Sequence, residues 1–149
     1  MTTCVCRSAE ITVGLPPEQA MSLFTAEGER LWADGWDPQY PESGRREGAG
    51  AVFTTGHGGH PTTWIMVDHG PRTVRYARVT EGMTAGTVAV DIVGSRERST
   101  RVRVTYDLTA LTPAGEKWLE AFDADYDTAI GEWATEIAAS LERQAGPDS

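Results

Sequence analysis

The sequence predicts an α+β domain in which a curved antiparallel sheet of about six strands wraps around one long C-terminal helix. Three observations lead to this prediction. Apolar residues near the end of the chain recur at steps of three and four, several earlier segments alternate between apolar and polar residues, and the connections between those segments are short. These are the respective signals of an amphipathic helix, of strands with one buried face and of antiparallel hairpins.

The helix is expected over residues 113–144. Pro113 suits a first helical position, Thr112 is a suitable N-cap, and Gly146 followed by Pro147 suits a stop. If this stretch is helical throughout, it is roughly 48 Å long at 1.5 Å per residue. A helix of that length crosses a domain of this size, so the rest of the chain must cover its apolar face. That face consists of Leu119, Phe122, Tyr126, Ile130, Trp133, Ile137 and Leu141.

The first strand runs to Val13, with Arg7 as the polar exception on its apolar side. Pro16 and Pro17 end this strand and begin the first of two short helices, and the second is expected over Thr25 to Trp32. Glycines and prolines indicate a loop over 35–50. The further strands are expected at 51–55, 62–69, 72–80, 84–94 and 101–111.

The composition indicates one domain over 1–149, with a frayed tail at 145–149. A formal net charge of −9 argues against a nucleic-acid partner, which favours a basic surface. No apolar run is long enough for membrane insertion, and the first residues lack the apolar segment of a secretion signal. We therefore expect a cytoplasmic protein.

No metal site is expected. Cys4 and Cys6 form a lone pair of thiols, which we expect to be reduced and structural. His57 and His60 bracket a glycine turn, while His69 lies at the far end of the next strand, and a metal needs three or four convergent ligands. The turn is expected to be an exposed hairpin tip. The alternative is that His57 acts as an acid or base at a cavity mouth, because its ordinary pKa is near neutral.

Several stretches carry a resemblance to a known family. They are Leu15-Pro16-Pro17-Glu18, Phe24 to Trp32, Gly35-Trp36-Asp37-Pro38, Thr55 to Gly59 before Thr63-Trp64, and Val104 to Thr109 before the final helix. With the order of the elements, they resemble the SRPBCC superfamily of START-like and birch-pollen-allergen-like helix-grip domains, in particular its polyketide cyclase and ATPase-activator-like branch. The chain looks most like bacterial members that have no assigned activity.

The resemblance implies a hydrophobic cavity between the sheet and the C-terminal helix. Our first hypothesis is that this cavity binds a small apolar or aromatic molecule without a cofactor. The first alternative is a cavity enzyme of the polyketide aromatase/cyclase type, of the hydrolase type or of another kind. The second is a protein-interaction module like the activators of heat-shock-protein ATPases. The superfamily has no universal catalytic motif, so no catalytic residue is assigned. A homodimer is a further alternative, because Gly131 in the helix has no other explanation.

Arg78 shares a strand face with Tyr76, and two arrangements are open. If the face points inward, Arg78 is a buried cation that needs an anionic partner, either a carboxylate or a ligand; if outward, it is a rim charge. Asp123, Asp125 and Asp127 are expected to be solvated and not to share a helix face. The candidate cavity-lining residues are Trp36, Trp64, Tyr76, Arg78, Tyr106, Phe122, Tyr126 and Trp133.

Overall fold

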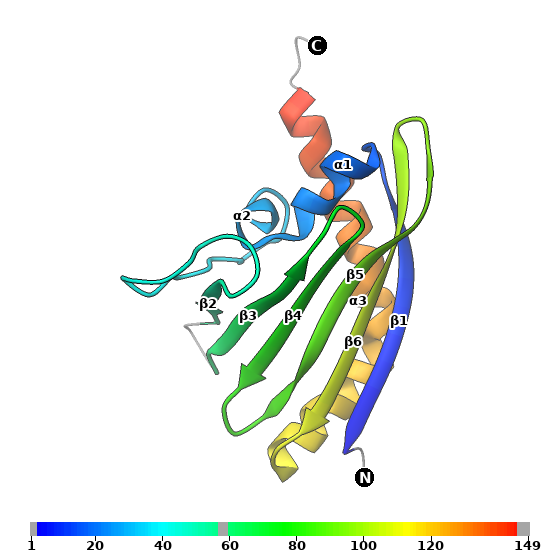
Figure 1. The fold of residues 1–149 in the computed structure, drawn as a ribbon. Coiled ribbons are helices and arrows are strands. Elements are labelled where there is room, and N and C mark those ends of the chain that lie inside the picture. Colours follow the sequence, from blue (N-terminus) through cyan, green and yellow to red (C-terminus); the bar gives the residue numbers. More distant parts are fainter. Residues whose placement is uncertain (1–2, 57–59, 146–149) are drawn as a thin grey trace.

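The computed structural model describes residues 3–56 and 60–145. A six-stranded antiparallel sheet has the strand order β1-β6-β5-β4-β3-β2, and a long helix, α3, lies behind it (Figure 1). The predicted fold class is confirmed. The strands are β1 Cys4–Val13, β2 Val52–Thr55, β3 Thr62–His69, β4 Thr73–Thr80, β5 Thr84–Arg96 and β6 Ser99–Ala110, and the helices are α1 Pro17–Ala20, the 3-10 helix η1 Met21–Phe24, α2 Ala26–Glu29 and α3 Pro113–Ala145.

The apolar stripe of α3 is the main contact between helix and sheet. Leu119, Tyr126, Ile130 and Ile137 are almost completely buried, as the spacing predicts. The predicted cap is also present, since Thr112 Oγ1 accepts a hydrogen bond of 3.1 Å from the Gly115 N–H. The backbone of α3 packs mainly on β1 and β6. The inner faces of β3, β4 and β5 are therefore covered by side chains and by the short helices.

Two polar contacts fix α3 on the sheet. The Tyr126 hydroxyl donates to the Val104 carbonyl over 2.6 Å. Arg7, the polar exception of the first strand, pairs with Asp123 over 2.9 Å and with Asp127 over 3.0 Å. The expectation that these aspartates are only solvated and share no face is wrong. They are four residues apart, so they lie on one side of the helix, where both reach Arg7.

The curvature of the sheet comes from two register shifts. One interrupts the pairing of β3 with β4 between Met66 and Asp68, and the other interrupts that of β5 with β6 between Ile92 and Gly94. An extra residue on one strand bends that strand and increases its twist. Figure 1 shows the resulting sheet curving across α3.

The inner face of the sheet is ordered in rows across neighbouring strands. Tyr76, Val88 and Tyr106 are register partners on β4, β5 and β6 and form one row. Arg78, Gly86 and Leu108 form the next row, with Trp64 of β3 opposite Arg78. A Cβ at Gly86 would lie 2.0 Å from the Asp107 carbonyl oxygen, so in this second row the backbone of β6 packs directly against β5. We refer to these as the tyrosine row and the arginine row.

The two short helices form the predicted bent pair. The second is a regular helix only over Ala26–Glu29, and turn hydrogen bonds continue to Ala33. The Thr25 hydroxyl caps it by accepting from the Gly28 N–H over 3.0 Å. A Cβ at Gly28 would lie 1.8 Å from the Ser22 carbonyl oxygen, so α2 packs against η1 in a way that only glycine allows.

Two glycines of α3 give a matched pair for testing the packing of the helix. A Cβ on buried Gly115 would lie 1.9 Å from the Met83 carbonyl oxygen, whereas Gly131 is exposed and has nothing within 4 Å of that position. We predict that Gly115→Ala lowers the free energy of unfolding by about 1–3 kcal/mol through overpacking. Gly131→Ala should raise it by about 0.5–1 kcal/mol because alanine favours helix. Chemical denaturation measures both, and equal effects would contradict the assigned contacts.

Candidate functional site

Arg78 is the most unusual side chain on the inner face. The inward arrangement is the correct one, since only 9% of the residue is exposed. Its guanidinium lies between two indole rings, 5.0 Å from the centroid of Trp64 and 5.8 Å from that of Trp118. One amino group donates to the Thr80 hydroxyl over 3.2 Å. The Nε–H has no acceptor among the described residues.

The surroundings of Arg78 supply no counter-charge. In the described part of the chain it pairs with no carboxylate, and the group that acts on its charge is the Tyr106 hydroxyl. Burial lowers the pKa of the guanidinium, and Tyr106 opposes that shift. A buried cation with an unmet hydrogen-bond donor is costly unless something else supplies the acceptor.

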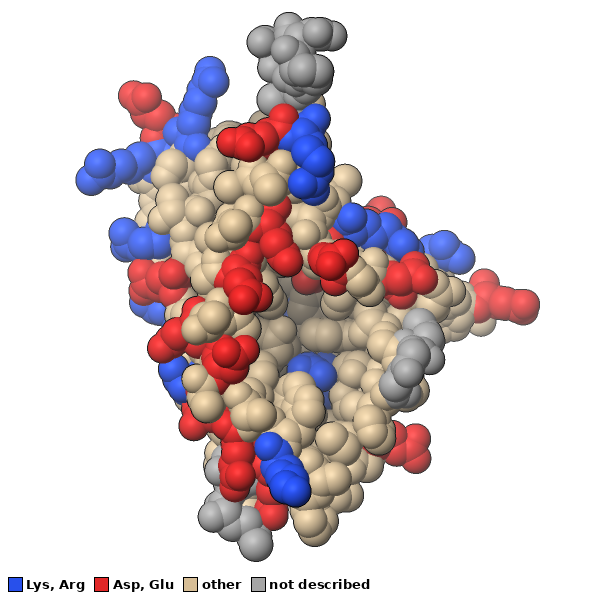
Figure 2. All heavy atoms as spheres, turned by 180° about the vertical axis from the view of Figure 1, so that it is seen from behind, with Lys and Arg blue, Asp and Glu red and all other residues tan. Residues whose placement is uncertain are grey.

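Arg78 lines a cavity of about 290 Å³, which we call the Arg78 cavity. It lies where the ends of β3, β4 and β5 meet the first turns of α3. Figure 2 shows a hollow on the α3 side of the molecule, with basic atoms at its floor and acidic side chains along its edge. The residues that line the cavity are His60, Thr62, Arg78, Thr80, Met83, Thr84 and Trp118.

The tyrosine row lies next to this cavity. The Tyr76 hydroxyl donates to the Phe24 carbonyl over 2.8 Å, which ties the row to η1. The Tyr106 hydroxyl has no hydrogen-bond partner among the described residues. Burial raises its pKa to about 12. Tyr106 is therefore a buried donor that is free to meet a bound molecule.

Glu29 of α2 acts electrostatically on the tyrosine row. Its charge raises the pKa of both Tyr76 and Tyr106. The residue is half-buried, and desolvation raises the pKa of its carboxyl well above the ordinary value. In the described ranges, 3–56 and 60–145, no side chain donates a hydrogen bond to this carboxyl.

The predicted cavity-lining residues form two aromatic groups on either side of Arg78. Trp36, Trp64 and Tyr76 belong to one group, in which Phe53 stacks on Trp64 with centroids 6.0 Å apart. Tyr106 and three residues of α3 belong to the other, with Tyr106 5.2 Å from Phe122. Tyr126 is completely buried and its hydroxyl is already bonded, so it is a packing residue. The α3 members of the second group are Phe122, Tyr126 and Trp133.

Sequence reasoning missed Trp118 and Glu29. Trp118 lies four residues before Phe122 and stacks on it at 5.1 Å, so the helical spacing alone could have placed it on the same side of α3. Glu29 carries no such signal, because an acid in a short polar helix ordinarily faces water.

The histidines do not form a site together. His60 lines the Arg78 cavity and His69 lines a different pocket, while His57 lies outside the described residues. Cys4 and Cys6 are free and exposed on the outer side of β1. Over the two described ranges, no three residues of the metal-binding types lie close enough to hold an ion.

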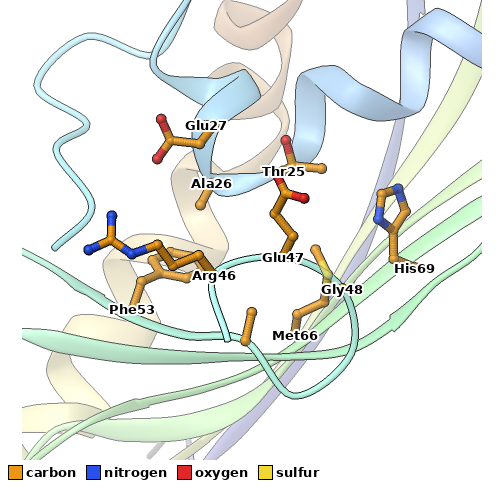
Figure 3. A pocket seen from close by; sticks show the side chains of 10 residues that line it. Thr25, Ala26, Glu27, Arg46, Glu47, Gly48, Phe53, Met66 and His69 are labelled. Carbon is orange, nitrogen blue, oxygen red and sulfur yellow. The ribbon is translucent and has the colours of Figure 1, made fainter. Parts of the chain in front are cut away.

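A more voluminous pocket lies at the edge of the sheet. It measures about 480 Å³ and is bounded by α2, the loop before β2 and strands β2 and β3 (Figure 3). Its floor is apolar, with Phe53 and Met66. Glu27 in this pocket accepts from Arg30 and Tyr40, and Arg46 lies over the Tyr40 ring. Glu47 is exposed to solvent, whereas Arg78 is buried with an unmet donor, so the larger volume gives a weaker reason for a ligand than Arg78 does.

Comparison of the fold with solved structures identifies its architecture. The chain superposes on protein MLL2253 from Mesorhizobium loti with a TM-score of 0.67 at 12% identity, over 93% of this chain and 98% of that one. It superposes on the Zhui aromatase/cyclase from Streptomyces sp. R1128 with a TM-score of 0.62 at 17% identity, over 96% and 98% of the two chains. It superposes on an HSP90 activator from Plasmodium falciparum with a TM-score of 0.58 at 17% identity, over 95% of this chain and 96% of that one.

The chain has the helix-grip fold. The superposed structures are 12–17% identical to this chain and confirm the architecture that the resemblance implies. No family model matches the chain, and no curated protein matches its sequence. None of the helices within the described residues has the length and apolar character needed to span a bilayer.

Desolvation of the Glu29 carboxyl makes the free energy of unfolding of this helix-grip domain depend on pH. A carboxyl whose folded pKa is raised contributes its full stability below about pH 4.3, its unfolded value, and loses it as the pH rises through the folded pKa. We predict that Glu29→Gln matches the wild type at pH 4 and has the larger free energy of unfolding at pH 8. Denaturant titrations over this range measure the difference, and a difference that does not vary with pH would contradict the desolvation of the Glu29 carboxyl.

Proposed function

We propose that this helix-grip domain binds a small aromatic or apolar molecule that carries an anionic oxygen. The apolar body of the ligand lies between the sheet and α3, and its anionic group meets Arg78. The observation that carries the proposal is the buried guanidinium with an unmet Nε–H and no carboxylate partner in the described part of the chain.

The energetics of Arg78 favour a ligand over a purely structural role. Removing a cation from water costs several kcal/mol, and contact with two indole rings returns only about 0.5–2 kcal/mol each. An arginine with a purely structural role would offset the remaining desolvation cost by pairing with a carboxylate, as Arg7 does with Asp123. A bound carboxylate or phenolate supplies the same charge and matches the planar fork of the guanidinium.

The walls of the cavity fit the apolar part of such a molecule. Trp118 and Met83 line the cavity, where Trp118 offers a ring face and Met83 a flexible apolar side chain. Trp64 does not line it but lies against the guanidinium of Arg78. A volume of about 290 Å³ lies at the lower end of the range of ligand pockets, about 300–1,000 Å³. A ligand with one or two rings suits this space.

A cyclase-like activity is the second candidate, because the buried polar side chains of Arg78 and Tyr106 lie on adjacent rows of the inner face. The Zhui protein is an aromatase/cyclase, but likeness of fold does not transfer an activity. Holding a flexible chain in a bent form beside such groups is a recognised route to ring closure. The similarity in fold to the HSP90 activator from Plasmodium falciparum suggests a protein-interaction role. Such a role does not explain the buried polar groups of the interior.

Binding of 2-naphthoate tests the proposal. Charged hydrogen bonds contribute about 1.5–3 kcal/mol, so Arg78→Met should weaken binding by about 10- to 100-fold. The ester methyl 2-naphthoate lacks the charge and should bind both proteins alike. Arg75 lies on the same strand with its side chain exposed, so Arg75→Met is the matched control and should leave the affinity unchanged.

Isothermal titration calorimetry measures the affinities, and chemical denaturation checks that each variant is folded. Removal of an unpaired buried cation should not lower the stability of Arg78→Met. Equal affinity of the wild type and Arg78→Met for 2-naphthoate, or no binding to the wild type, would overturn the proposal.

A further inference from the structure

We infer that the anionic group of the ligand is a monoanion with three terminal oxygens, namely the –SO₃⁻ group of an aryl sulfonate or of an aryl sulfate ester. The observation that carries this inference is a row of buried threonine hydroxyls beside Arg78. The inference rests on the proposed function, which places an anion at Arg78, and it adds the chemical class of that anion.

The threonines lie across three neighbouring strands. Thr80 follows Arg78 by two residues on β4, and its register partners are Thr62 on β3 and Thr84 on β5. All three line the Arg78 cavity, and they are only 2–7% exposed. Residues that are directly opposite in a sheet have Cβ atoms about 4.5–5.5 Å apart. The three hydroxyls, which we call the threonine row, therefore form a narrow polar strip next to the arginine row.

Arg78 and the threonine row form one connected set of donors. The guanidinium donates to Thr80 Oγ1 over 3.2 Å, and the hydroxyls of Thr80 and Thr62 lie 2.6 Å apart. This pair has two hydroxyl hydrogens and uses one of them for its own bond, so the other has no acceptor among the described residues. The Thr84 hydroxyl has no hydrogen bond to a described residue either. Free hydrogens are therefore available from the guanidinium, from the Thr62–Thr80 pair and from Thr84.

The charges around the cavity favour a monoanion. Arg78 is the permanent cation among the described residues that line it, and none of these residues is a carboxylate. One guanidinium balances one negative charge, so a second negative charge would be buried without a partner, at a large cost in free energy. Sulfonates and sulfate esters carry one charge, whereas a phosphate monoester carries close to two at neutral pH.

The directions of the free donors favour three oxygens. Neighbouring strands are about 4.8 Å apart, so donors from the β3 side and from the β5 side reach an anion over β4 from opposite directions. The guanidinium of Arg78 supplies a third direction. A carboxylate held in the arginine fork has two oxygens, and both are committed to that fork. An –SO₃⁻ group presents one oxygen to each of the three donors.

Two matched pairs of ligands test the shape and the charge of the anion separately at pH 8. Naphthalene-2-sulfonate and 2-naphthoate have the same charge and differ in the number of oxygens. The esters 2-naphthyl sulfate and 2-naphthyl phosphate have the same shape and differ in charge. The wild type should bind the sulfonate tighter than the carboxylate, and the sulfate ester tighter than the phosphate ester.

Variants of Thr84 assign the preference to the threonine row. Thr84→Val removes the hydroxyl and should weaken binding of the sulfonate and the sulfate ester by about 10-fold, with 2-naphthoate almost unaffected. Thr84→Ser keeps a hydroxyl and should bind all four ligands as the wild type does. Exposed Thr87 on the same strand gives the control Thr87→Val, which should also behave as the wild type. Calorimetry measures the affinities, and denaturation curves confirm that the variants are folded.

The outcomes separate this inference from the proposed function. If Arg78→Met weakens binding of the anions but Thr84→Val affects sulfonate and carboxylate equally, or affects neither, the inference is wrong and the proposed function stands. Tighter binding of 2-naphthoate than of the sulfonate, or of the phosphate ester than of the sulfate ester, also overturns the inference. If the wild type binds none of the anions, or if Arg78→Met binds them all as the wild type does, the proposed function fails and the inference fails with it.

Discussion

The apolar stripe along α3 is the constraint on which the rest of the structure depends. A helix of 33 residues with one apolar side needs a large apolar surface in return, and the inner face of the curved sheet supplies it. The helix does not lie over the middle of that sheet. Its backbone packs on β1 and β6, where Tyr126 and Arg7 hold it. The inner faces of β3 and β4 are left for aromatic side chains and the short helices to cover.

This offset separates matched from unmatched polar groups in the interior. Where α3 packs on β1 and β6, a carbonyl accepts from Tyr126 and two aspartates pair with Arg7. On β4 the matching stops, since the buried Nε–H of Arg78 has no acceptor among the described residues. Natural interiors contain few such groups. Its occurrence beside a cavity is the physical basis for proposing a ligand in this part of the molecule.

The periodicities in the sequence predicted much of this architecture, because they reflect the burial of whole elements. The stripe of α3, the cap at Thr112 and the alternation of β6 follow from residue spacing and the chemistry of single side chains. The relation of Asp123 and Asp127 to Arg7 was wrongly predicted, since it depends on a strand more than a hundred residues away. The inward placement of Arg78 was an open alternative, because a single face of a strand does not reveal which side is covered.

What the sequence determined by itself is the set of elements and their antiparallel order, since local hydrogen bonding and the period of apolar residues specify them. What only the tertiary structure decided is the chemistry of the interior. Glu29 belongs to a short polar helix, and its carboxyl is desolvated once Tyr76 and Trp32 tie that helix region to η1 and the sheet. Trp118 stands over Arg78 only because α3 crosses the sheet at that place. Such contacts join residues far apart in the chain, so no local pattern encodes them.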